Sequence, residues 1–191
     1  FDLACDNGCD MKVIATIGKS DVDYLNPNYE VACEVDWEED IELFSAYDTP
    51  VMLVDEFITD AYKWNLTSKI LTNINDAGSL SGIVTAFPYR TTDLLKDNID
   101  MGLFDFYMIP LNSFAYMMDT PSFLKAQRKE FRQKILDLNK KIIACRVLSV
   151  GIQTPQEGFT FLNSLDFVDL MTFGVASVDE IKKDMEVLKG L

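Results

Sequence analysis

The stretches Lys141–Cys145 (KIIAC) and Thr154–Glu157 (TPQE) together decide the fold class. The first is a short continuous apolar run, which is typical of a strand buried on both faces in a parallel sheet. The second is a capping box, in which a threonine oxygen accepts a hydrogen bond from an otherwise unpaired backbone N–H and proline fits the first helical position. A strand followed by a helix start is one unit of an α/β protein.

The same unit recurs along the chain. Five more apolar runs predict strands, at Lys12–Ile17, Pro50–Val54, Gly82–Ala86, Asp105–Ile109 and Phe167–Phe173. Each of these is followed by a candidate helix start, in turn Asp36, Thr59-Asp60, Thr91-Thr92-Asp93, Thr120-Pro121 and Ser177–Glu180. Strict alternation of strands and helices predicts a parallel sheet with right-handed crossovers.

Two closures of such a sheet compete, an open doubly wound sheet and a barrel. A dinucleotide-binding doubly wound sheet needs a glycine-rich turn after its first strand, but Ile17–Ser20 holds one glycine, and Gly18-Lys19-Ser20 lacks the upstream glycine of a P-loop. Phe1–Asn7 is typical of the end of a helix that stops at Asn7-Gly8. We therefore expect one domain, residues 1–191, that forms units three to eight of a parallel (β/α) TIM-type barrel and is incomplete at its N-terminus.

The charge balance narrows the range of partners. The chain has 17 Lys and Arg residues against 31 Asp and Glu residues, a formal net charge of −14. Such a chain repels phosphate backbones and anionic membrane surfaces, so we expect a small-molecule ligand, no nucleic acid and no membrane. The charge balance leaves open whether the chain forms a homo-oligomer.

The chain contains no histidine and four cysteines. The missing histidine excludes a histidine-dependent catalytic triad within this chain and the commonest metal ligand. The cysteines are expected to be reduced thiols, which favours a cytoplasmic protein.

The C-terminal part resembles a known family. Lys141–Ile152 with Thr154–Glu157 is similar to the seventh strand and loop of aldo/keto reductase-like barrels, and Val168–Ile181 is similar to their eighth strand and following helix. Asp105–Asn112 resembles the strand of such barrels that ends in a Pro-x-Asn turn. The resemblance spans residues 104–191 and favours an archaeal and bacterial branch of the group. It implies the barrel fold and, more generally, NAD(P)-dependent reduction, although the family's catalytic residues lie mainly in the half that is unmatched here.

In a (β/α) barrel, functional groups lie at the C-terminal ends of the strands. Asp55, Glu56 and Asp60 follow the second apolar run, where they could bind a divalent metal or divide acid and base roles. They could equally form a solvated helix start, where acids are favourable. Lys19 follows the first run and is either a catalytic or anion-binding amine or a surface lysine.

Other strand ends carry candidate groups for binding an anion or a cofactor. The helix start at Gly174 and Ser177 offers backbone N–H groups to a phosphate, although Ser177 could be a simple cap. Arg146 could grip an anion with its guanidinium fork, and Tyr89 and Asn112 are further candidates.

These observations leave three functions open. The first is an enzyme that acts on a small anionic or phosphorylated metabolite, with Lys19, Asp55 and Glu56 as catalytic groups. The second is an NAD(P)-dependent aldo/keto reductase-like oxidoreductase. The third is a non-catalytic barrel subunit for binding or assembly. The cofactor would be NAD(P) or a divalent metal.

Overall fold

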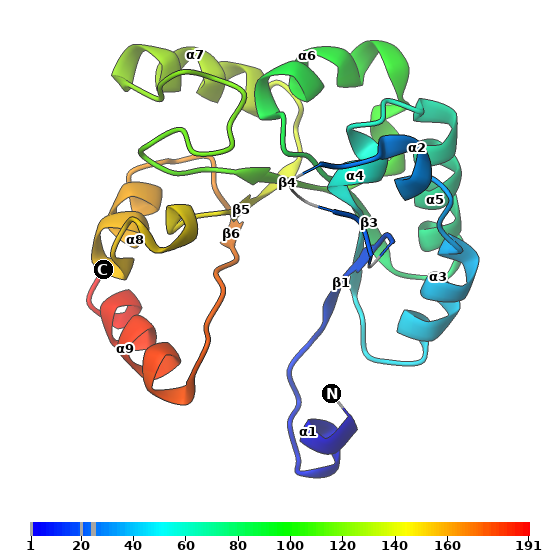
Figure 1. Ribbon diagram of the computed structural model, residues 1–191, viewed down its shortest axis with the longest axis horizontal. Helices are drawn as coiled ribbons and strands as arrows, with labels where there is room; N and C mark the ends of the chain where they lie inside the picture. The colour runs from blue at the N-terminus through cyan, green and yellow to red at the C-terminus, as the bar shows by residue number, and fades with distance from the viewer. Residues whose placement is uncertain (1, 20, 24–25) are drawn as a thin grey trace.

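The computed structural model describes residues 2–19, 21–23 and 26–191. The strands of this part of the chain form one parallel sheet in the order of the sequence. They are β1 (Ile14–Ile17), β2 (Val51–Val54), β3 (Leu80–Val84), β4 (Phe106–Pro110), β5 (Lys141–Cys145) and β6 (Leu170–Met171). All six predicted strands are confirmed, and the sheet curls into part of a (β/α) TIM-type barrel (Figure 1).

The helices between the strands lie around the outside of the sheet, while α1 lies on the arm that precedes β1 and α9 follows β6 (Figure 1). They are α1 (Asp2–Asp6), α2 (Tyr29–Ala32), α3 (Trp37–Ser45), α4 (Glu56–Thr59), α5 (Trp64–Asp76), α6 (Pro88–Asn98), α7 (Lys125–Leu136), α8 (Pro155–Asn163) and α9 (Val178–Lys189), with short 3₁₀ turns at Met101–Leu103 and Ser149–Gly151. No helix in the described part of the chain is long and apolar enough to cross a membrane.

The sheet is apolar on both faces. The face toward the helices contributes Ile17, Val54 and Ile83 to the main core. The opposite face holds a second cluster of Val51, Leu53, Val84 and Ile143. Burial on both faces is the physical reason why the strand sequences are continuous apolar runs rather than alternating ones.

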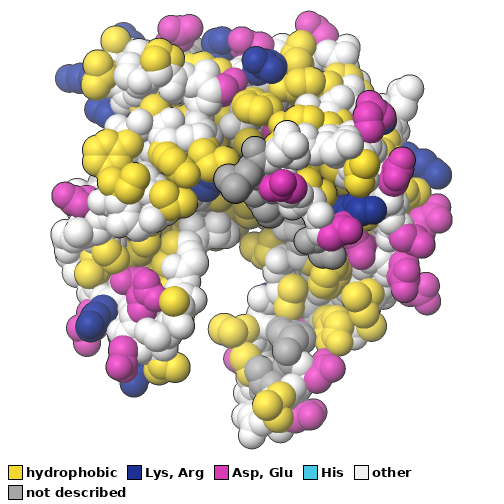
Figure 2. All heavy atoms as spheres, in the orientation of Figure 1, with side chains coloured by type: hydrophobic (Ala, Val, Ile, Leu, Met, Phe, Trp, Pro, Cys, Tyr) yellow, Lys and Arg dark blue, Asp and Glu magenta, His cyan; other side chains and the backbone are white. Residues whose placement is uncertain are grey.

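The two edge strands of the sheet, β1 and β6, do not pair with each other. Ile14 of β1 and Leu170 of β6 are 41% and 45% exposed, while the central strands are largely buried. Figure 2 shows an open gap between the N-terminal arm that precedes β1 and the segment that holds α9. The sheet of the described residues is therefore a partial barrel wall, not a closed ring.

The predicted helix starts have mixed outcomes. Asp36, Thr154 and Ser177 are confirmed as N-caps of α3, α8 and α9. The predicted start at Thr59-Asp60 is wrong, because α4 ends there and α5 begins at Trp64.

Two further helix starts are also wrong. Thr91-Thr92-Asp93 lies inside α6, which begins at Pro88 because proline fits a first turn. Thr120-Pro121 precedes α7, which begins at Lys125. The predicted helix end at the N-terminus is confirmed, because α1 stops before Gly8, whose φ of 83° suits glycine.

Candidate functional site

A parallel sheet brings the C-terminal ends of its strands to one edge. Glu56 follows β2, Thr85 follows β3 and Arg146 follows β5, so all three lie at the mouth of the curled sheet. This is the face where (β/α) barrels carry their functional groups.

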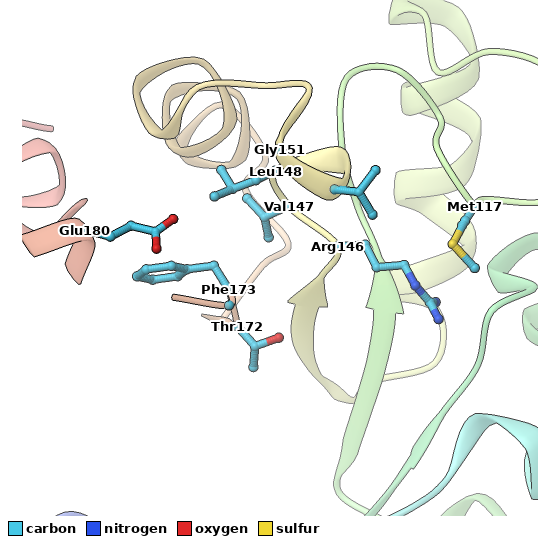
Figure 3. A pocket seen from close by; sticks show the side chains of 10 residues that line it. Met117, Arg146, Val147, Leu148, Gly151, Thr172, Phe173 and Glu180 are labelled. Carbon is cyan, nitrogen blue, oxygen red and sulfur yellow. The ribbon is translucent and has the colours of Figure 1, made fainter. Parts of the chain in front are cut away.

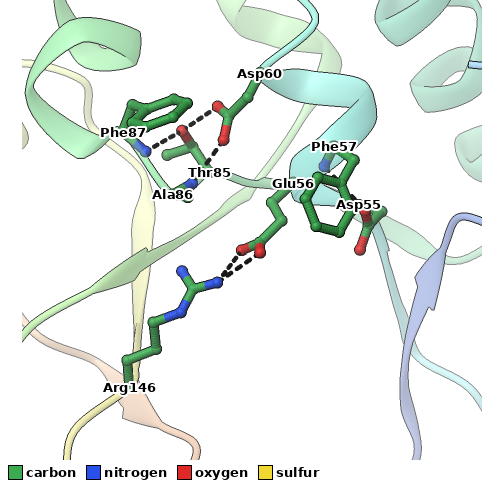
Figure 4. A network of polar contacts seen from close by, with 8 residues as sticks. All are labelled: Asp55, Glu56, Phe57, Asp60, Thr85, Ala86, Phe87 and Arg146. Carbon is green, nitrogen blue, oxygen red and sulfur yellow. Dashed lines mark hydrogen bonds and ion pairs between the residues drawn. The ribbon is translucent and has the colours of Figure 1, made fainter. Parts of the chain in front are cut away.

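The main feature of the mouth is a buried ion pair between Glu56 and Arg146. Both carboxylate oxygens of Glu56 accept from Nη2 of Arg146, at 2.5 and 2.7 Å (Figure 4). The side chains are only 8% and 18% exposed. In a flat sheet, β2 and β5 would lie about 14 Å apart, three strand spacings of about 4.8 Å. The pair therefore bridges β3 and β4 across the mouth.

The backbone around Arg146 is held in an unusual conformation. Arg146 has a φ of 54°, and Ser149 and Val150 have φ values of 49° and 53°. Residues other than glycine rarely adopt this region, and such strain collects at functional sites. The fully buried amide of Asn112 donates to the backbone oxygen of Arg146 at 3.3 Å and to that of Tyr116 at 3.0 Å. Asn112 thus supports the segment that presents Arg146.

Asp60 forms a second buried polar group beside the pair. It is 7% exposed, and its carboxylate accepts from the Thr85 hydroxyl, from the Ala86 N–H at 2.8 Å and from the Thr91 hydroxyl at 3.4 Å. Burial raises the pKa of Asp60 to about 7, and the charge of Glu56 adds to this rise, while the hydrogen bonds from Thr85 and Ala86 oppose it. Asp60 therefore titrates near neutral pH.

Asp55 is half-buried at the end of β2. Its carboxylate caps α4 by accepting from the Phe57 N–H at 2.9 Å, and burial raises its pKa. A Cβ atom on Gly18 would lie 2.4 Å from the Cβ of Asp55. Glycine is thus required after β1 for the two strand ends to approach each other.

The predicted metal set is not assembled. Asp55, Glu56 and Asp60 bind three different partners: a backbone N–H, Arg146, and the Thr85 and Ala86 donors. Among the residues that the structure describes, no group of three or more acidic or cysteine side chains is placed to hold a metal ion.

Two other predicted residues make contacts outside the ion pair. The ammonium of Lys19 is 3.9 Å from Asp21 at the end of β1. The ring of Tyr89 stacks on Phe131 in the helix layer, with 4.5 Å between centroids. The Tyr89 N–H, in the first turn of α6, donates to Asp119 at 2.9 Å. The structure therefore brings Glu56 and Arg146 together but not Lys19 or Tyr89.

A cavity of about 590 Å³ lies beside Arg146 (Figure 3). Its walls come from the ends of β5 and β6 and from α9, and include Leu148, Thr172, Gly174 and Glu180. A volume of this size suits a small metabolite or part of a cofactor.

The N-terminus of α9 already holds groups of the chain itself. Ser177 accepts from the Glu180 N–H at 3.2 Å, and the Glu180 carboxylate accepts from the Ala176 N–H at 2.6 Å. The capping role considered for Ser177 is present, and a phosphate at Gly174 and Ser177 would meet the Glu180 charge.

Sequence reasoning missed the hydroxyl groups around Asp60. Thr85 follows β3 directly, so its position at a strand end was a usable signal. Thr91 was assigned to a helix start instead, and Tyr62 gave no signal because its place depends on a backbone φ of 55°.

Comparisons with known proteins support the fold. No protein-family model and no curated sequence matches the chain. Among solved structures it is similar to a "Putative aldo-keto reductase from Pseudomona aeruginosa", with a TM-score of 0.58, 12% identity, and coverage of 91% of this chain and 64% of that one. A second crystal structure with the same enzyme description and organism gives a TM-score of 0.57, 13% identity and the same coverage.

The chain thus spans 64% of the length of these two solved structures. At 12–13% identity, the likeness concerns the fold and not the activity. The expected aldo/keto reductase-like barrel fold is confirmed: the chain folds as six consecutive β/α units of a barrel similar to those of aldo-keto reductases.

Proposed function

We propose that this protein is a barrel enzyme that binds the anionic group of a small metabolite through Arg146. The buried Glu56–Arg146 pair carries the proposal. An arginine held in a largely desolvated mouth binds carboxylates and phosphates more strongly than one in water. Arg146 also lines the cavity of about 590 Å³, which gives the rest of the ligand a place beside it.

Glu56 is proposed as the counter-ion of Arg146 before the ligand arrives. Both of its oxygens contact Nη2, so an incoming anion must share or replace this contact. Asp55 is proposed as one group for proton transfer at the end of β2, since burial raises its pKa. The net charge of −14 favours a small ligand over nucleic acid.

The six units are proposed to be the third to eighth of an eight-unit barrel. The open edges at β1 and β6 and the 64% coverage of the two solved structures support a partial barrel. The numbering is supported by the resemblance of Lys141–Ile152 and Val168–Ile181 to the seventh and eighth units.

An NAD(P)-dependent reductase is the second candidate. It is favoured by the fold of the two solved structures and by the cavity between the ends of β5 and β6 and α9. The charge of Glu180 at the α9 N-terminus weighs against a phosphate group at that position.

A thermal-shift screen with inorganic phosphate, acetate, oxalate and NADPH tests these proposals. A ligand at 100 times its dissociation constant stabilises by about 2.7 kcal/mol, which raises the Tm of a protein of this size by about 5–10 °C. A shift with phosphate or a carboxylate that disappears in Arg146→Gln supports the anion site. The matched control is Arg132→Gln, which removes an arginine from an exposed pair with Asp166.

Other outcomes decide against the anion site. A shift with NADPH alone favours the reductase. No shift with any of these ligands refutes the anion site and favours the non-catalytic subunit.

A further inference from the structure

A chain of three hydroxyl groups leads from Asp60 toward the surface. The Thr85 hydroxyl contacts Oδ1 of Asp60, the Thr91 hydroxyl lies 2.8 Å from that of Thr85, and the Tyr62 hydroxyl lies 3.4 Å from that of Thr91. Thr85 and Thr91 are fully buried. The contacts form one continuous path through Thr85 of the β3–α6 connection, Thr91 of α6 and the segment after α4.

The hydroxyl groups of the path can donate their hydrogen bonds in either of two opposite directions. With Asp60 ionised, Tyr62 donates to Thr91, Thr91 to Thr85, and Thr85 to the carboxylate. With Asp60 protonated, every donation reverses, and Tyr62 donates to solvent. Each hydroxyl keeps one donor and one acceptor role in both states.

The amide groups near Asp60 fix where its proton must lie. The Ala86 N–H donates to Oδ2 at 2.8 Å, so the proton of the neutral acid belongs on Oδ1, the oxygen that faces Thr85. The Phe87 N–H donates to the Thr85 hydroxyl at 3.0 Å, which leaves the Thr85 proton for Asp60 or Thr91. Burial raises the pKa of Asp60 to about 7, so both states are populated near neutral pH.

The two ends of the path lie in different surroundings. The inner end, Asp60, is close enough to Glu56 for the Glu56 charge to raise its pKa. The outer end, Tyr62, is half-buried beside the exposed Arg90 and lines a surface hollow of about 460 Å³. The charge of Asp60 also acts on Tyr29 and Tyr107, but burial raises the pKa of both tyrosines, so each stays neutral near pH 7.

We propose that Asp60, Thr85, Thr91 and Tyr62 form a proton-transfer path between the solvent and the mouth of the barrel. This extends the proposed function, because it assigns the proton supply of a reaction at the Arg146 site. When Asp60 gives its proton to a bound substrate, the three hydroxyl groups turn so that each again donates toward Asp60. Thr85 then passes its proton to Asp60, Thr91 to Thr85 and Tyr62 to Thr91. Tyr62 then takes one proton from water, so one proton is drawn from solvent for each one delivered.

The test follows proton exchange in the ligand-free protein by NMR. Exchange of the Thr85 and Thr91 hydroxyl protons with water is read from hydrogen–deuterium isotope shifts at the threonine β carbons at pH 7. Tyr62→Phe removes the outer hydroxyl and should slow both exchange rates by a factor of about ten or more. The control variant Tyr116→Phe removes the hydroxyl of a tyrosine that contacts Asn112 through its backbone N–H, and it should leave both rates unchanged.

A second measurement separates a proton path from a structural role. The carboxyl carbon shift of Asp60 should still titrate near pH 7 in Tyr62→Phe, because Thr85 and Ala86 remain in place. Slow exchange with this titration preserved supports the path. Unchanged exchange in Tyr62→Phe overturns it, as does equal slowing in Tyr116→Phe. Neither readout needs a ligand, so failure of the anion site would leave this result intact.

If Tyr62→Phe does not fold, Thr91→Val and Thr91→Ser provide the same test at the middle of the path. Thr85 exchange should slow in Thr91→Val and stay near the wild-type rate in Thr91→Ser. Equal rates in the two variants would overturn the proposal.

Discussion

Replacing Arg146 with methionine should strongly destabilise the protein, because the Glu56 side chain is only 8% exposed and its carboxylate would lose the contact with Arg146. Removing one member of a buried ion pair costs about 3–5 kcal/mol. Glu56→Gln removes the carboxylate that contacts Nη2 of Arg146 and should also destabilise the protein. The double variant leaves no buried charge at this position, so it should be less destabilised than the sum of the two single variants.

Urea unfolding measures this prediction. With a slope of about 2 kcal/mol per molar, each single variant should move the midpoint down by about 1.5–2.5 M. The coupling energy between the two positions should exceed about 2 kcal/mol. The matched control is the pair of Arg132 and Asp166, whose side chains are 42% and 64% exposed. Exposed pairs couple by about 1 kcal/mol or less.

A coupling energy below about 0.5 kcal/mol at Glu56 and Arg146 would refute the reasoning. It would mean that the two side chains are solvated and do not form a buried pair across the mouth.

Three further predictions concern single positions. Asp60 has a pKa of about 7 in the fold and about 3.9 in the unfolded chain, so its contribution to stability is full below pH 4 and is lost as the pH rises through 7. The free energy of unfolding of Asp60→Asn minus that of wild type should therefore increase by about 4 kcal/mol between pH 4 and pH 8, as measured by urea titrations. A difference that stays constant over this range would contradict the burial argument. Gly82→Ala should cost about 1–3 kcal/mol, because its Cβ would lie 2.5 Å from the Phe106 backbone oxygen, whereas Gly174→Ala, with nothing within 4 Å, should be neutral in the same assay. Thr154→Ala removes the cap of α8 and should lower the free energy of unfolding by about 1 kcal/mol, and an unchanged midpoint would show that the capping box is dispensable.

The strands could be predicted from the sequence because burial on both faces of the sheet gives each strand a continuous apolar run. The predicted strand Lys141–Cys145 has the same bounds as β5, and the predicted strand Pro50–Val54 begins one residue before β2. Capping at Thr154 and Ser177 was also predictable, since it depends on residues three positions apart. Local signals of this kind do not need the tertiary fold.

The errors arose where tertiary structure overrides local signals. The sequence predicts at Asp55–Asp60 a metal or acid–base site or a solvated helix start. A helix does start there, with Asp55 as the cap of α4, but Glu56 and Asp60 are buried rather than solvated. The pairing of Glu56 with Arg146 joins positions 90 residues apart and depends on the curl of the sheet. Sequence reasoning placed both residues at the mouth but could not predict that they contact each other.

The most direct test of the account compares the binding of inorganic phosphate to wild type, Glu56→Gln and Arg146→Gln by calorimetry. If Arg146 grips the anion and Glu56 competes for the same guanidinium, the two variants must change the affinity in opposite directions. At about 5 Å and an effective dielectric constant of about 20, the Glu56 charge repels a bound anion by about 3 kcal/mol, so Glu56→Gln should bind phosphate at least about tenfold more tightly. Arg146→Gln should abolish binding. Weaker or unchanged binding in Glu56→Gln would contradict the proposed competition at the mouth of the barrel.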